Sequence, residues 1–98
     1  MITRRMKWIV QQLKKHPGAI ITHSRDEFMG KSFYTLEWGG DNKEPYASHE
    51  VTNEMKKKLV AANLIQIVQE RPVYTKTGKF VTTERDYGLK EVASEKTD

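Results

Sequence analysis

The chain has no cysteine, only three prolines and no long apolar run among its 98 residues. The lack of cysteine excludes disulfide bonds and thiolate metal sites, and it is typical of proteins in a reducing compartment. A membrane-spanning helix needs about 20 consecutive apolar residues, which no segment approaches. The N-terminal stretch MITRRMKWIVQQLKKH also lacks the continuous apolar centre of a signal peptide. We therefore expect a cytoplasmic protein that does not associate with membranes.

The charge is mildly basic and unevenly placed. The formal net charge is +4, which favours acidic partners such as nucleic acid. Residues 1–16 hold five Lys or Arg and no acidic residue, whereas residues 84–98 hold five Asp or Glu and three Lys or Arg. The length indicates one domain, which we place at residues 1–89, followed by a flexible, frayed tail at residues 90–98.

Apolar spacing and turn residues predict the first half of the chain. The spacing of Ile2, Met6, Ile9 and Leu13 predicts a helix over residues 3–15, ended by a Pro17-Gly18 pair. Residues 19–23 and 32–38 follow as the two strands of a β-hairpin, because their apolar and polar residues alternate. Residues 39–45 are rich in Gly, Asp and Asn and predict a loop.

The second half predicts another helix and another hairpin. Val51, Met55, Leu59 and Ala62 fall on one helical face, so we expect a helix over residues 49–62 with Ser48 as its N-cap. Residues 64–68 predict a strand that pairs with residues 87–89. The segment between them is extended, and its tip lies at residues 75–79. The expected fold is α+β in the order helix, β-hairpin, helix, β-hairpin.

The second predicted helix is followed at once by Asn63-Leu64-Ile65 and a Gly-tipped basic hairpin. This order is similar to the second half of a winged-helix domain. The resemblance covers residues 50–89 and implies a recognition helix over 49–62 and a wing over 65–89. It does not extend to the first half, where a hairpin stands in place of a third helix. We therefore expect a winged-helix-like fold.

One small family shares this departure from the standard winged helix. A leading helix is followed by an "I.H.RD...G" segment (Ile21, His23, Arg25, Asp26, Gly30), a hairpin, a basic helix ending in "KL...NLI" and a final hairpin. This outline resembles that of the YjhX-type proteins. These proteins are described as toxins that inhibit a bacterial topoisomerase. The resemblance implies a small phage or bacterial protein that binds an enzyme of nucleic-acid metabolism.

Three consecutive lysines interrupt the apolar pattern of the second predicted helix. Lys58 lies at the edge of the apolar face, where Glu54 can pair with it. The outward face combines long cations with short amides and hydroxyls, which suit phosphates and base edges in a DNA groove. The predicted contacts are Thr52, Asn53, Lys56, Lys57 and Asn63. The alternative is that this face is only solvated.

The predicted hairpin tip adds Lys76 and Lys79 on either side of Gly78. A basic tip of this kind can hold the DNA backbone or reach the minor groove. The alternative is an ordinary polar turn, in which Lys and Gly are both common. We expect the tip and the lysines of the preceding helix to form one positive surface.

Trp8 lies outside the apolar stripe of the first predicted helix, beside Arg4 and Lys15. Exposed aromatic residues are enriched at protein interfaces, so these three residues predict a contact with a homodimer partner or another protein. The alternative is that the hairpin or the tail covers Trp8. If Trp8 is exposed, the chain is a protein-binding module or an inhibitor of a nucleic-acid enzyme.

Residue types for catalysis or metal binding are present but not at useful spacing. His16, His23 and His49 do not share a helical face, so we expect no metal and no cofactor. Adjacent strand residues point to opposite faces, which keeps His23, Ser24 and Asp26 from converging as a relay. Aromatic residues on the first hairpin leave RNA binding as a minor alternative. The leading hypothesis is a non-enzymatic regulator that binds duplex DNA.

Overall fold

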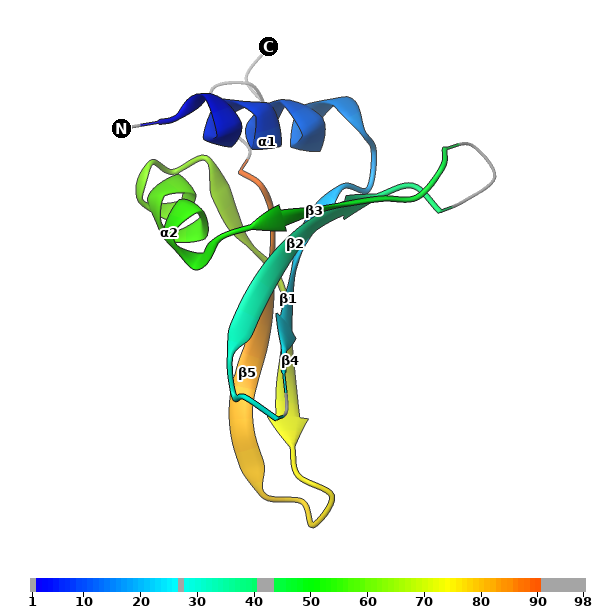
Figure 1. Cartoon of the computed structure of the whole chain (residues 1–98), viewed down its shortest axis with the longest axis vertical. Coiled ribbons are helices and arrows are strands. Elements are labelled where there is room, and N and C mark those ends of the chain that lie inside the picture. The colour runs from blue at the N-terminus through cyan, green and yellow to red at the C-terminus, as the bar shows by residue number, and fades with distance from the viewer. Residues whose placement is uncertain (1, 27, 41–43, 91–98) are drawn as a thin grey trace, which may run out of the picture.

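The computed structural model describes residues 2–26, 28–40 and 44–90. In chain order the elements are α1 (Arg4–Lys15), β1 (Ile20–Arg25), β2 (Ser32–Trp38), β3 (Ala47–Val51), α2 (Asn53–Ala61), β4 (Ile65–Tyr74) and β5 (Phe80–Leu89). The strands form one antiparallel sheet in the order β3-β2-β1-β5-β4 (Figure 1). Because the last hairpin lies next to β1, the two halves of the chain share one sheet.

Helix α1 forms where the apolar spacing predicts it. The Thr3 hydroxyl accepts a hydrogen bond from the Met6 N–H at 3.1 Å, which satisfies one of the free donors at the helix start. The core-facing side chains are Met6, Ile9, Val10 and Leu13. The helix ends before Gly18, whose φ of 82° lies in the left-handed region. The prediction of a helix over residues 3–15 is confirmed to within one residue.

The predicted start of the second helix is wrong. Residues Ala47–Val51 form β3, which pairs with β2 along its whole length, from Tyr34↔Val51 to Trp38↔Ala47. The helix begins one turn later, because Thr52 and not Ser48 accepts a hydrogen bond from a helical N–H, that of Met55 at 3.1 Å. Both hydroxyls suit a helix start, and the strand ladder decides between them. Val51 therefore reaches the core from a strand.

The extra strand overturns the predicted fold class. The observed order is helix, three strands, helix and two strands, in place of helix, hairpin, helix, hairpin. A winged helix is rich in helices, whereas this molecule is built on a five-stranded sheet with two helices. The winged-helix and YjhX-type resemblances are therefore incorrect. They relied on the order of local elements, which does not define how those elements assemble.

The last hairpin is longer than the sequence indicated. Its predicted inner pairing is confirmed, with Ile65 opposite Leu89 and Ile67 opposite Tyr87. The ladder continues outward to the Tyr74↔Phe80 pair, with irregularities after Ile67 and after Val73. The Thr75 N–H donates to the Lys79 carbonyl at 2.8 Å, which closes the predicted tip. Of the predicted tail, residues 91–98 lie outside the described residues.

The core lies at one end of the molecule. Both helices bury apolar side chains against the same face of the sheet, where Ile21, Leu36 and Leu59 are fully buried. The longest dimension is 50 Å, and the β4–β5 hairpin extends along it away from the helices (Figure 1). We call the two parts the helical end (α1, α2 and the strands they cover) and the distal end (residues 25, 26, 28–32 and 72–82). No helix of the described chain has the length and apolarity needed to cross a membrane.

Candidate nucleic-acid interface

Positive charge is concentrated in the two helices. Together α1 and α2 contain eight of the 17 Lys and Arg residues but one of the 13 Asp and Glu residues, a formal charge of +7. The rest of the chain therefore carries −3, since the total is +4. The mild net charge therefore combines two strongly basic helices with five strands that together carry −2. Such a surface attracts polyanions more strongly than the net charge suggests.

Helix α1 carries a continuous cationic stripe. At about 100° per residue, Arg4, Lys7, Lys14 and Lys15 fall within an arc of roughly 100°, away from the buried side chains. All four side chains are exposed. Within the described chain none of them belongs to an ion pair. The stripe is about 16 Å long at 1.5 Å per residue, which matches several phosphates of a nucleic-acid strand.

The predicted contact residues of α2 divide into two groups. Asn53 and Lys57 are exposed and available. Lys56 instead turns toward the sheet, where its ammonium lies 5.0 Å from the Tyr34 ring centre and 5.5 Å from that of Tyr87. Burial, together with the nearby Lys57 and Arg85 cations, lowers the pKa of Lys56. Its cation–π contacts give Lys56 a packing role beneath the helix.

Thr52 and Asn63 mark the two ends of α2. The Thr52 hydroxyl is occupied as the N-cap acceptor described above. Asn63 has a φ of 65°, the left-handed conformation that commonly ends a helix, and its side-chain oxygen accepts a hydrogen bond from the Lys90 ammonium. Sequence reasoning grouped these residues with the base contacts because their side chains are short and polar. In the structure, Thr52 caps the start of α2 and Asn63 ends the helix.

The structure does not bring Lys76 and Lys79 to the same surface as the helices. The tip lies at the far end of the β4–β5 hairpin, and α2 lies at the opposite end of the long axis (Figure 1). The expected single positive surface of helix and tip is therefore not formed. Both helices lie together at the other end of the molecule (Figure 1).

Trp8 is held in an aromatic cluster. Its ring meets the edge of His49 at 4.9 Å between centroids and lies 6.3 Å from Trp38. The Arg5 guanidinium covers it at 4.6 Å from the ring centre. Trp38 is in turn stacked on His16 at 4.3 Å and on His49 at 5.3 Å. Trp8 thus has a packing role between α1 and the sheet, while Arg4 and Lys15 remain exposed beside it.

A buried polar network, which the sequence did not reveal, joins β1 to the last hairpin. The buried Asp86 carboxylate accepts hydrogen bonds from the His23 backbone N–H at 3.1 Å and from the Arg71 guanidinium. Arg71 also donates to the His23 carbonyl at 3.2 Å, and the Arg85 N–H donates to the His23 Nδ1 at 3.2 Å. Side chains thus complete the β1–β5 contact beyond the Ile21↔Tyr87 pair.

Burial and charge shift the pKa values of this network. Burial lowers the pKa of His23, assisted by the Lys56 and Arg71 cations and opposed chiefly by Glu84. Burial acts to raise the pKa of Asp86, but the hydrogen bonds from Arg71 and from the His23 N–H outweigh it, so the pKa is lowered. His23 is therefore a neutral acceptor at Nδ1, and Asp86 is a carboxylate paired with Arg71.

The network does not form a proton relay. Asp86 contacts the backbone of His23 and not its imidazole, and the Nδ1 lone pair is engaged by the Arg85 N–H. In a Ser-His-Asp relay the carboxylate binds one ring nitrogen and leaves the other facing the substrate. In His23 the second nitrogen, Nε2, is buried and has no hydrogen-bond partner among the described residues. The described residues also contain no group of three His, Asp or Glu side chains placed to hold a metal ion. The arrangement is suited to joining strands.

Comparison with known proteins identifies no relative: no family model, no curated protein and no solved structure matches the chain.

Proposed function

We propose that this chain is a non-enzymatic protein that binds duplex DNA through the cationic surface of its two helices. The contacts are the α1 stripe of Arg4, Lys7, Lys14 and Lys15, together with Lys57 and Asn53 of α2. The observation that carries the proposal is the charge of +7 on the helices against −3 on the rest of the chain. Phosphate neutralisation by Lys and Arg supplies most of the non-specific affinity of DNA-binding proteins.

Three features of the stripe support this role. Its cations are exposed, and none is neutralised by an ion pair within the described chain. They also stand on a well-packed helix, whose apolar face is anchored by Met6 and Ile9 in the core. A rigid row of cations binds phosphates with little loss of backbone entropy. The contacts of Trp8 with Trp38 and His49 favour an electrostatic role for α1 over an aromatic contact with a protein partner.

The test is the salt dependence of DNA binding. Fluorescence anisotropy with a labelled duplex, at two or more salt concentrations, should show an affinity that falls steeply as salt rises. The double variant Lys14→Gln/Lys15→Gln should lower the slope of log K against log salt by about 1.8, since each lost phosphate contact removes about 0.9. Binding should weaken similarly for duplexes of different sequence, because phosphate contacts carry no sequence information.

The matched control is Lys76→Gln/Lys79→Gln, which removes the same charge from exposed positions at the distal end. It should leave the duplex slope unchanged. Equal losses in the two variants would mean that only net charge matters, and the proposed surface would be rejected. The proposal would also fail if the native protein showed no duplex binding at low salt.

A further inference from the structure

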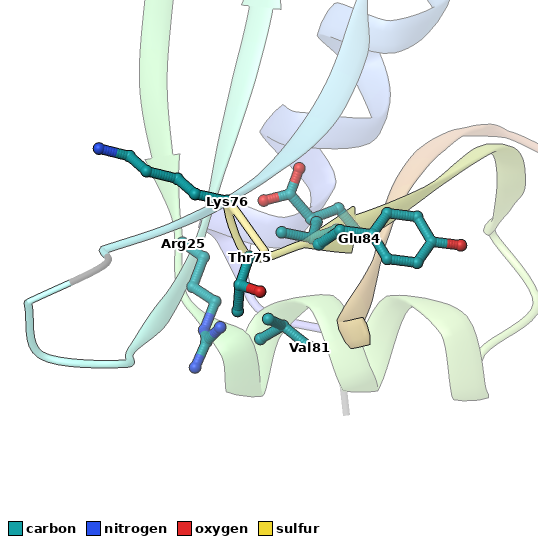
Figure 2. A pocket seen from close by; sticks show the side chains of 7 residues that line it. Arg25, Thr75, Lys76, Val81 and Glu84 are labelled. Atoms are coloured by element: carbon teal, nitrogen blue, oxygen red, sulfur yellow. The ribbon is translucent and has the colours of Figure 1, made fainter. Parts of the chain in front are cut away.

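A cleft at the distal end is separate from the helical surface. It has a volume of 360 Å³ and lies between the end of β1 and the outer part of the β4–β5 hairpin. Figure 2 shows the side chains around it, with Arg25 and Lys76 extending outward in different directions. The lining residues are Arg25, Val73, Tyr74, Thr75, Lys76, Val81 and Glu84. The cleft therefore combines apolar walls with cations at its border.

Aromatic rings beside the cleft are left largely in solvent. Tyr74 is 56% exposed and Phe80 is 55% exposed, although the two rings meet edge to face at 5.9 Å. Phe28, in the turn between β1 and β2, is fully exposed. That turn is held by Asp26, whose side chain accepts hydrogen bonds from the Phe28 and Met29 N–H groups at 2.9 and 3.3 Å. The backbone of this turn thus holds the Phe28 and Met29 side chains in largely exposed positions.

Around these rings the described chain has four cations and two carboxylates, so the charge is positive on balance. Arg25, Lys31, Lys76 and Lys79 lie in the same two turns, at the end of β1 or at the hairpin tip. The acidic residues nearest to them in the described chain are engaged: Asp26 holds its own turn, and Glu84 pairs with Arg71 at 3.4 Å. A partner that fits this surface has negative charge together with flat apolar groups.

We propose that the distal end binds single-stranded nucleic acid, with bases stacked on Tyr74 and Phe80 and the backbone held by Arg25, Lys76 and Lys79. Single strands offer both phosphates and unpaired ring faces, which duplexes keep stacked inside. A membrane surface is the less suitable partner, because the outermost residues of the tip, Thr75 to Lys79, are polar and the rings lie behind them. This site is separate from the duplex surface on the helices, so each proposal can fail alone.

The test uses a labelled oligothymidylate of about twelve nucleotides, within the usual range of site sizes for such proteins. The variant Tyr74→Leu/Phe80→Leu keeps apolar side chains at both positions but removes the ring faces. It should weaken binding of the single strand about ten-fold or more and leave duplex binding unchanged. Far-ultraviolet circular dichroism and thermal unfolding check that the variant is folded.

A second measurement locates the contact directly. An oligonucleotide that contains iodouracil should photocrosslink to Tyr74 or Phe80, as identified by mass spectrometry. Lys14→Gln/Lys15→Gln is the control and should retain the crosslink. The inference is overturned if the leucine variant binds the single strand as tightly as the native protein, if the crosslinks fall on α1, or if the native protein binds anionic vesicles and not the oligonucleotide.

Discussion

The helical end and the distal end of the molecule use the same kinds of residue in opposite ways. At the helical end, apolar side chains such as Ile21 and Leu59 are fully buried. At the distal end, Phe28 and Tyr74 are exposed, because no helix covers the two turns (Figure 1). The hydrophobic effect therefore stabilises one end, whereas apolar surface stays exposed at the other. The comparison shows that burial of apolar side chains stabilises the helical end far more than the distal end.

The two ends are connected by the network of His23, Arg71 and Asp86. It lies where β1 leaves β5, beyond the Ile21↔Tyr87 pair, and it replaces backbone pairing with side-chain hydrogen bonds. A buried carboxylate is tolerated there because a guanidinium and a backbone N–H satisfy it. The network should therefore hold the β4–β5 hairpin in place against β1 beyond the edge of the core.

The largest contrast between the ends should appear in alanine substitutions. Leu59→Ala should lower the free energy of unfolding by about 2–5 kcal/mol, because it leaves a cavity in the core. Phe28→Ala should change it by less than about 0.5 kcal/mol, since the ring is fully exposed. Urea denaturation followed by circular dichroism measures both. A strongly destabilised Phe28→Ala protein would show that the distal turn supports the fold.

A smaller effect should distinguish the network from surface ion pairs. Arg71→Met should destabilise the protein by about 2 kcal/mol, because it leaves the buried Asp86 carboxylate without its cation. Since the Arg71 side chain is 34% exposed, we expect less than the full cost for a buried pair. Arg85→Met is the matched control: its pair with Glu70 is about half exposed and should contribute less than about 1 kcal/mol. Similar losses in both variants would show that the network contributes no more to the free energy of unfolding than the surface pair does.

The smallest expected effect is a pH dependence that arises from His23. Its pKa is lower in the folded state than the ordinary value of 6.5, so below pH 6.5 the unfolded chain takes up a proton that the folded protein does not. The His23 contribution to the free energy of unfolding is thus constant above pH 6.5. It falls below that pH, by up to about 1.4 kcal/mol per pH unit, until the folded pKa is reached.

Denaturation of the native protein and of His23→Gln between pH 8 and pH 5 measures this term, and the variant should lose it. His49→Gln, which leaves His23 in place, should retain it. Asp86 adds a separate loss in stronger acid, since its folded pKa is also lowered and its contribution disappears as the pH falls through that value. If His23→Gln kept the full slope below pH 6.5, the buried imidazole would not be its source.

Local patterns predicted α1, the hairpin of residues 19–38 and the inner pairing of β4 with β5, because each depends on residues close in sequence or on simple alternation. The predicted start of α2 was wrong because Ser48 and Thr52 suit the N-cap equally well, and only the pairing of β2 with residues 47–51 decides between them. For the candidate surface, the sequence predicted Lys57 as a DNA contact, whereas it assigned Arg4 and Lys15 to a protein contact beside Trp8. It placed Lys56 with Lys57 because a helical wheel cannot show that Tyr34 and Tyr87 lie beneath it.

The sequence by itself determined the amphipathic first helix, the basic character of both helices and the glycine-tipped hairpin, all of which follow from side chains within a few turns of one another. Only the tertiary structure decided that the hairpin tip and the second helix lie far apart, that both helices lie at one end of the sheet, and that Asp86 meets Arg71 beside β1. Strand order and long-range pairing control those positions. They depend on contacts between residues tens of positions apart, which no local pattern records.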